Sequence, residues 1–193
     1  MPSQHFTQFE RSRLLVVDDD PILREFAVCN LKSDKVSVVT AGDGAEALHL
    51  LTRLEFDIAL VDLDMPIMDG FELIGLVRAD TRLRHLPIVV ATGREDMDSV
   101  DKAYASGATS FVVKPLNWRL IAHQLSYVLR ANREEALVRQ TLKNLQQANA
   151  AHREILDRAI RRLERAAVQP QAEEMQRLAL ELSAAVTLVS TCT

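Results

Sequence analysis

The chain has 193 residues, of which 48% are hydrophobic and 26% are charged. This composition is that of a globular protein and excludes a disordered or fibrous chain. The net charge of −4 gives no overall indication of nucleic-acid binding.

Cysteine usage and hydropathy indicate a cytoplasmic protein. The two cysteines, Cys29 and Cys192, are far apart and lack metal-ligand spacing, which is typical of a reducing compartment without a disulfide framework. No apolar run approaches the roughly 20 residues that a membrane span needs. Residues 1–13 lack the apolar core of a signal peptide. We therefore expect a cytoplasmic location and no membrane partner.

Short β-branched runs alternate with stretches of helical spacing from residue 13 to about residue 130, after residues 1–12, which we expect to be flexible. Four of the five runs are nearly continuously apolar, as in strands buried on both faces of a parallel sheet. The second run contains Ser37 and Thr40 and resembles an edge strand. The runs are Leu14–Val17, Val36–Thr40, Ile58–Val61, Ile88–Ala91 and Ser110–Val113.

A helix start signal follows each of the first four runs. Asp20 followed by Pro21 fits an N-cap and a first-turn proline. The other starts and the end of the fourth helix are predicted at Asp43, Asp69, Asp96 and Gly107. Five strands alternating with helices predict a flavodoxin-like doubly wound parallel sheet of strand order 2-1-3-4-5.

The tail, residues 131–193, predicts a helical dimerisation segment. After Leu116 the chain contains one proline, Pro170, and no glycine, so we expect one long helix to about residue 167. After a break around Pro170, a short return helix is expected at residues 172–189, which would make a helical hairpin. A heptad seam of coiled-coil type runs along the long helix, at Val138, Leu142, Leu145, Asn149, His152, Leu156, Ala159, Leu163 and Ala166.

Polar residues follow four of the predicted strands, at the edge where open α/β sheets place their sites. They are Asp18, Asp19 and Asp20 after the first strand, Asp62 after the third, Thr92 after the fourth, and Lys114 with Pro115 after the fifth.

Adjacent carboxylates repel one another, so this cluster predicts a bound cation. Oxygen ligands and water suit Mg²⁺, and Asp18, Asp19, Asp62 and a backbone carbonyl near Asp64 could supply them. A carboxylate beside Mg²⁺ is a possible nucleophile toward phosphorus. Lys114 would pair with a phosphoryl group and Thr92 would donate a hydroxyl to it; a cis bond before Pro115 would aim the lysine inward.

Four motifs together resemble the receiver domains of two-component response regulators. They are Leu-Val-Val-Asp-Asp-Asp-Pro at residues 15–21, Asp-Ile-Ala-Leu-Val-Asp-Leu-Asp-Met-Pro-Ile-Met-Asp-Gly at 57–70, Ile-Val-Val-Ala-Thr-Gly at 88–93 and Gly-Ala-Thr-Ser-Phe-Val-Val-Lys-Pro at 107–115. They agree with the family in type, order and spacing, and the resemblance covers about residues 12–130.

The resemblance implies a role for each matching residue. Asp62 resembles the phosphoacceptor, Asp18 and Asp19 the acidic pair that binds Mg²⁺, Thr92 the switch hydroxyl, Lys114 the invariant lysine and Phe111 the switch aromatic. Asp64 and Arg94 occupy positions that modulate dephosphorylation in the family.

The resemblance also implies a phosphorelay. A histidine kinase or a phosphotransfer protein would donate a phosphoryl group to Asp62, and the tail would transmit the resulting change to a protein output partner. We see no separate enzymatic domain and no helix-turn-helix signature, so we expect no DNA partner.

Other interpretations remain open at this stage. The Asp62-Leu-Asp64 sequence also resembles the phosphatase motif of haloacid-dehalogenase-like enzymes, but that motif normally sits on a first strand. The chain could be a structural coiled-coil adaptor with a vestigial receiver, or the N-terminal regulatory piece of a longer regulator. His152 is either a seam or surface histidine or a phosphorelay histidine, and Asn149 either fixes coiled-coil register or is simply exposed.

Overall fold

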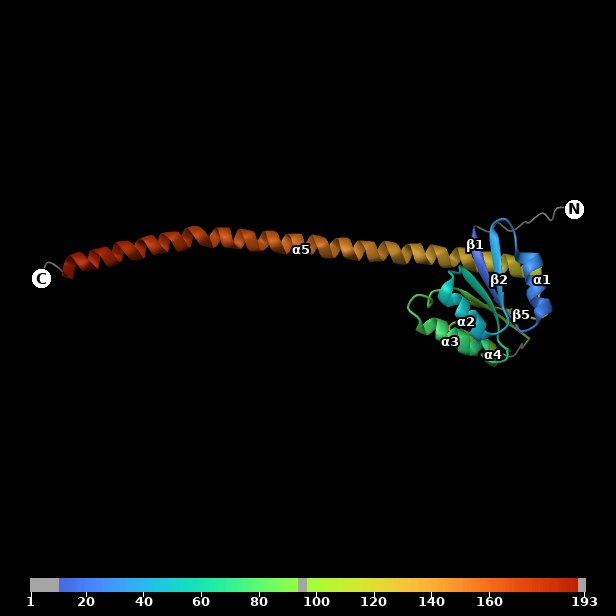
Figure 1. The fold of residues 1–193 in the computed structure, drawn as a ribbon. Coiled ribbons are helices and arrows are strands. Elements are labelled where there is room, and N and C mark those ends of the chain that lie inside the picture. Colours follow the sequence, from blue (N-terminus) through green and yellow to red (C-terminus); the bar gives the residue numbers. More distant parts are fainter. Residues whose placement is uncertain (1–10, 94–96, 191–193) are drawn as a thin grey trace. The chain divides into compact units, whose positions relative to one another are not determined.

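A computed structural model describes residues 11–93 and 97–190, and within them strands alternate with helices along the chain (Figure 1). The elements are β1 Ser12–Val17, α1 Pro21–Leu31, β2 Val36–Ala41, α2 Gly44–Arg53, β3 Ile58–Asp62, α3 Gly70–Ala79, β4 Ile88–Thr92, α4 Met97–Ala105, β5 Ser110–Val113 and α5 Trp118–Ser190. Residues 1–10 lie outside the described residues, whereas Ser12, at the end of the segment 1–12 expected to be flexible, begins β1.

The strands form one parallel sheet of order β2-β1-β3-β4-β5, which confirms the predicted flavodoxin-like topology. All five predicted runs are strands, and β2 is an edge strand as expected. The order reverses beside β1, so the carboxyl ends of β1 and β3 flank the place where doubly wound sheets form sites.

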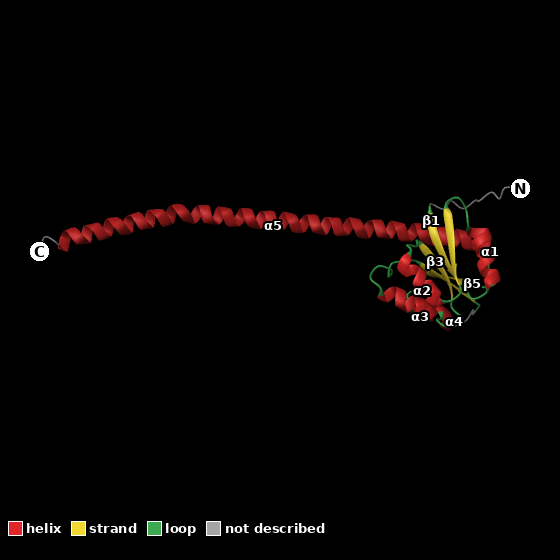
Figure 2. Ribbon diagram, viewed as in Figure 1, coloured by secondary structure: helices red, strands yellow, loops and turns green. Residues whose placement is uncertain are grey.

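Helices lie on both faces of the sheet (Figure 2). An apolar cluster packs against each face, which is why the central strands are apolar on both sides. One cluster packs α2, α3 and α4 against the sheet through Leu51, Leu73 and Ala103. The other packs α1 and the start of α5 against the opposite face through Leu31 and Leu125. The strands are thereby fixed at the core, and their carboxyl ends are held in a rigid frame.

The helix caps follow the sequence prediction. The carboxylate of Asp20 accepts a hydrogen bond from the backbone N–H of Ile22, and those of Asp43 and Asp69 accept bonds from the first turns of α2 and α3. Such caps satisfy N–H groups that have no partner within the helix. The predicted cap at Asp96 lies outside the described residues.

The predicted break near Pro170 and the return helix at residues 172–189 are wrong, because α5 runs from Trp118 to Ser190 without interruption. A proline within a helix removes one hydrogen bond and costs roughly 3 kcal/mol. The residues on either side are rich in Ala, Glu, Gln and Leu, which are strong helix formers. In a helix of this length, the cost of one proline does not outweigh the helix propensity of the residues on either side of it.

The chain divides into two units, Met1–Ala136 and Leu137–Thr193. The first contains the sheet, its covering helices and the start of α5, and the second contains the rest of α5. Among the described residues, no helix is sufficiently long and apolar to cross a bilayer.

The turn before β5 is built on Gly107, whose φ is +100°. The Arg78 side chain lies over this glycine and donates from Nε to the Gly107 carbonyl at 2.9 Å and from Nη1 to the Leu86 carbonyl at 2.9 Å. A Cβ at residue 107 would lie 2.9 Å from the Arg78 side chain. The turn therefore needs glycine for both its backbone conformation and its closeness to Arg78.

Two glycine-to-alanine substitutions should change stability in opposite directions. Gly107→Ala should destabilise the fold by about 2 kcal/mol, because it strains the backbone and displaces Arg78. Gly75→Ala, in the middle of α3, should stabilise it by up to about 1 kcal/mol, because a Cβ there meets nothing within 4 Å. Urea unfolding of both variants measures the difference, and equal effects of the two would contradict this account of the turn.

Candidate functional site

Three buried polar residues meet at the carboxyl edge of the sheet. Asp18 directly follows β1, Asp62 is the last residue of β3, and Thr92 is the last residue of β4. Their exposed fractions are 4%, 5% and 2%. Because β3 lies between β1 and β4, these residues come from three neighbouring strands, as the sequence predicts.

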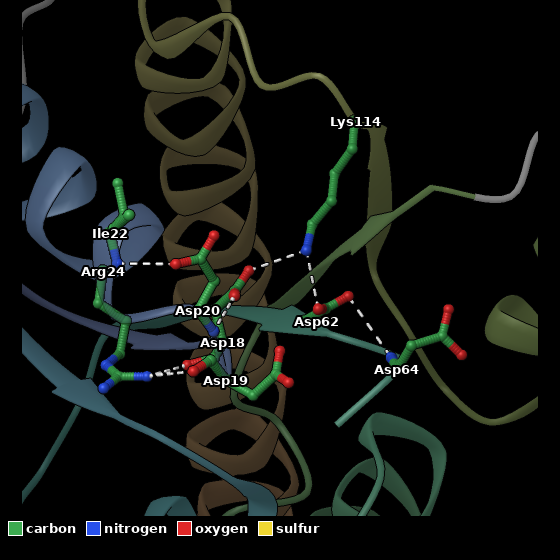
Figure 3. A network of polar contacts seen from close by, with 8 residues as sticks. All are labelled: Asp18, Asp19, Asp20, Ile22, Arg24, Asp62, Asp64 and Lys114. Atoms are coloured by element: carbon green, nitrogen blue, oxygen red, sulfur yellow. Dashed lines mark hydrogen bonds and ion pairs between the residues drawn. The ribbon is translucent and has the colours of Figure 1, made fainter. Parts of the chain in front are cut away.

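Asp18, Asp19 and Asp62 converge so that one carboxylate oxygen from each lies within 4.8 Å of the others. Asp19 is exposed, whereas the other two are buried. Lys114 follows β5 and bridges the two buried carboxylates (Figure 3): its Nζ donates to Asp62 Oδ2 at 2.7 Å and to Asp18 Oδ2 at 2.9 Å. The Lys114–Pro115 bond is cis.

The electrostatics of this cluster favour an additional cation. Burial raises the pKa of Asp62 above its ordinary value, which outweighs the lowering by the hydrogen bond and charge of Lys114, and the Asp18 charge raises it further. Burial also lowers the pKa of Lys114, but the hydrogen bonds and charges of Asp62 and Asp18 outweigh that effect and raise it. Lys114 thus stays charged, and one lysine does not balance three carboxylates.

Arg24, on α1, fixes the loop that carries the acidic pair, and sequence reasoning missed it. Its Nη1 donates to the backbone carbonyls of Asp18 at 2.6 Å and Asp19 at 3.0 Å. The Asp18 carboxylate in turn accepts the backbone N–H of Asp20 at 2.9 Å. The only available signal was a basic residue one turn into a helix that follows an acidic loop, a pattern found on many helices.

The loop between β3 and α3 approaches the site closely. A Cβ at Gly70 would clash with the backbone carbonyl of Asp62, so only glycine fits there. The Asp64 backbone N–H faces Asp62 Oδ1 at 3.5 Å. Ile67 has a φ of +68° and is 84% exposed, and a β-branched residue in that region is strained. Such strain is often found beside functional sites.

The remaining predicted residues lie around the same edge. Phe111, on β5, is partly buried and packs edge-on against Tyr104 of α4, with ring centroids 5.9 Å apart. The Lys114 backbone N–H donates to the Thr92 carbonyl at 2.8 Å, which ties the ends of β4 and β5 together. Arg94 lies outside the described residues.

A family model described as "Response regulator receiver domain" matches residues 14–126 of the chain. The chain belongs to the response-regulator receiver family. The family is the one that the four sequence motifs resemble, so that expectation is confirmed.

Two curated relatives and one solved structure illustrate the similarity. The DNA-binding response regulator MtrA of Mycolicibacterium smegmatis is 35% identical over 125 residues, which are 65% of this chain and 54% of MtrA. The heme response regulator HssR of Staphylococcus aureus is 31% identical over 131 residues, 68% of this chain and 57% of HssR. The chain therefore spans little more than half of these relatives' length. The structure of the chemotaxis response regulator CheY4 of Vibrio cholerae has a TM-score of 0.58 and 32% identity, over 61% of this chain and 98% of that one.

Proposed function

We propose that Asp62 accepts a phosphoryl group from the phosphohistidine of a histidine kinase or a phosphotransfer protein. An Asp62 carboxylate oxygen attacks phosphorus, an O–P bond forms, and the P–N bond to the donor imidazole breaks, with the electron pair leaving on nitrogen. The product is an acyl phosphate on Asp62 and a free histidine on the donor. Family membership supports this reaction in a receiver domain.

The observation that carries the proposal is the convergence of Asp62 with Asp18, Asp19 and Lys114. A carboxylate nucleophile needs positive charge beside it to approach an anionic phosphoryl group. The Lys114 ammonium is 2.7 Å from Asp62 and supplies part of that charge. One carboxylate oxygen of Asp18 and one of Asp19 lie within 4.8 Å of an Asp62 oxygen, which supports a shared cation.

The residues present fit Mg²⁺, which we propose as the cofactor. Its ligands would be carboxylate oxygens of Asp18, Asp19 and Asp62 and the backbone carbonyl of Asp64, with water completing the shell. When bound, Mg²⁺ offsets the charge on the phosphoryl oxygens and lets an anionic nucleophile approach.

A double variant tests the metal site. We expect Mg²⁺ to bind the wild-type chain with a dissociation constant of roughly 0.1 to a few millimolar, because water completes part of its shell. Asp18→Ala with Asp19→Ala should weaken binding at least about tenfold, since it removes two of the three carboxylates. Calorimetric titration measures both. A double variant that binds Mg²⁺ as tightly as the wild type would place the metal elsewhere.

Phosphorylation would change the polar contacts of the site. The acyl phosphate carries a charge of about −2 where a −1 carboxylate stood. Lys114, which now bridges Asp18 and Asp62, would pair with the phosphoryl oxygens. We propose that Thr92 donates its hydroxyl to the phosphoryl group and that Phe111 moves inward behind it, which shifts the population between two states of the β4–β5 face.

The output would leave through α5, which follows β5 directly. We propose that α5 pairs with the α5 of a second copy along the heptad seam and that this dimer presents the signal to a protein partner. Seam residues Val138, Leu142 and Leu156 are 58%, 55% and 61% exposed in the single chain.

Our expectation of no DNA partner stays a prediction, and MtrA is named as DNA-binding. We propose a cytoplasmic location on the basis of cysteine usage. A longer regulator with further domains remains compatible with these observations.

The proposed function is tested with phosphoramidate as a small phosphodonor and with beryllofluoride as a stable phosphoryl mimic. The chain should take up about one phosphoryl group per molecule with Mg²⁺ present and none after EDTA treatment. Beryllofluoride should bind under the same condition and compete with phosphoramidate. A chain that binds neither reagent at saturating Mg²⁺ would be a vestigial receiver, and the adaptor interpretation would replace the phosphorelay.

A further inference from the structure

A hollow of about 1090 Å³ lies at the amino-terminal edge of the sheet, at the opposite end of the strands from the acidic cluster. The segments leading into β1, β2, β3 and β4 form its walls, together with Asn132 and Arg133 of α5. Its volume is similar to that of the larger pockets that hold small organic ligands.

The hollow is strongly basic within an acidic domain. Seven of its lining residues are Lys or Arg and three are Asp or Glu, whereas residues 1–130 contain 14 Lys and Arg against 19 Asp and Glu. The side chains of Lys35 and Arg53 have no hydrogen bond or ion pair among the described residues. Positive charge thus collects in a concavity, where low-dielectric walls strengthen the attraction for an anion.

Hydrogen bonds build this hollow. Arg133 Nη2 donates to the Arg11 carbonyl at 2.8 Å and lies 3.3 Å from Asp57 Oδ1. The other oxygen of that carboxylate accepts the Arg13 backbone N–H at 2.7 Å. Asp57 is thereby held by two groups of the wall, so the positions of α5 and β1 around the hollow are fixed.

Apolar residues complete the lining of the hollow. Phe56, Leu54 and Pro87 add non-polar surface to the same lining.

We propose that this hollow binds a small molecule that carries phosphate groups and a flat non-polar part, as a nucleotide does. Arg53 and Lys35 would pair with phosphate oxygens, for which guanidinium and ammonium groups are the usual partners. The surface around Phe56 would contact its non-polar part. The site is independent of the proposed function, because it shares no residue with the acidic cluster.

The test uses ADP and inorganic pyrophosphate as probes with the full chain, in EDTA so that neither reaches the acidic cluster as a metal complex. Calorimetry should show saturable binding of ADP below about 1 mM, and weaker binding of pyrophosphate, which has no flat group to contact Phe56. Absence of saturable ADP binding up to that concentration overturns the proposal. So does binding to duplex DNA or to anionic vesicles without binding to ADP.

Matched variants locate the site. Lys35→Glu with Arg53→Glu should weaken ADP binding at least about tenfold, whereas Arg119→Glu, an exposed charge reversal on α5 outside the hollow, should leave it unchanged.

Two further measurements separate this proposal from the phosphorelay. Asp62→Asn should bind ADP like the wild type, and the Lys35→Glu, Arg53→Glu variant should still react with phosphoramidate and Mg²⁺. Loss of ADP binding in Asp62→Asn would place the ligand at the acidic cluster and overturn the proposal, as would equal weakening by Arg119→Glu.

Discussion

Asp62→Asn should reduce labelling by phosphoramidate to below about 1% of the wild-type level, the loss expected when a covalent reaction loses its nucleophile. The amide nitrogen and oxygen do not form an acyl phosphate, and the substitution also removes an anionic ligand from the proposed Mg²⁺ site. Asp62 is the carboxylate closest to Lys114, at 2.7 Å. Asp62 ends the central strand β3. Among the described residues, Asp18 is the only other buried carboxylate.

Asp20→Asn is the matched control for this experiment. Asp20 belongs to the same acidic run, but its carboxylate caps α1 by accepting the Ile22 backbone N–H at 2.8 Å. Asparagine is an equally good N-cap, so this variant loses one negative charge near the site without losing the helix start. Its labelling should stay within about threefold of the wild type. Acid-stable or undiminished phosphate in Asp62→Asn would show that the acceptor is another residue.

Most of the fold and of the acidic site was predictable, because both depend on local sequence signals. Continuous apolar runs such as Ile58–Val61 predict buried parallel strands, and the strand order follows from βαβ connections. Parallel strands bring their carboxyl ends to one edge, so Asp18, Asp62 and Thr92 had to be neighbours once the strands were placed. Their burial and the Lys114 bridge then follow from packing.

The features that were missed depend on contacts between segments far apart in sequence. The Arg24 side chain donates to the backbone carbonyl oxygens of Asp18 and Asp19. Every residue has such a carbonyl, so the sequence does not indicate which one is bonded. The bond between Arg133 and Asp57 joins residues 76 positions apart, and no periodicity reports such a pair. The break at Pro170 was predicted from one residue, although the helix propensity of its long flanks has the larger combined effect.

The uninterrupted α5 changes what the dimer hypothesis predicts. A return helix would have covered part of the seam within each chain, and a four-helix bundle would have followed. With one continuous helix, the stripe at Val138, Leu142, Leu145 and Leu156 remains exposed, each residue by more than half of its surface. A helix this long gains little stability from propensity alone and normally covers an apolar stripe against another helix. A second copy in parallel register does so with two-fold symmetry and aligns Asn149 with its equivalent.

Leu142→Glu with Leu156→Glu should therefore convert the full chain to a monomer. Each substitution places carboxylates from both copies in an apolar seam, and together they should weaken the dimer more than about 100-fold. Sedimentation at roughly 50 µM should show a dimer for the wild type and a monomer for the variant. Leu137→Glu with Gln147→Glu adds the same charge at positions outside the seam spacing, so this control should remain dimeric.

Truncation after Ala136 completes the experiment. This end point keeps Arg133 with its bonds to Arg11 and Asp57, which a truncation after Arg130 would remove, and it coincides with the end of the first structural unit. The shortened chain should be monomeric and should still react with phosphoramidate, because Asp18, Asp62 and Lys114 all lie in that unit. If the intact chain sediments as a monomer, the seam does not bind a second copy, and its apolar stripe must be covered by a different partner. If both the intact and the truncated chain are dimers, the dimer contact lies within residues 1–136, and the rest of α5 is not needed for it.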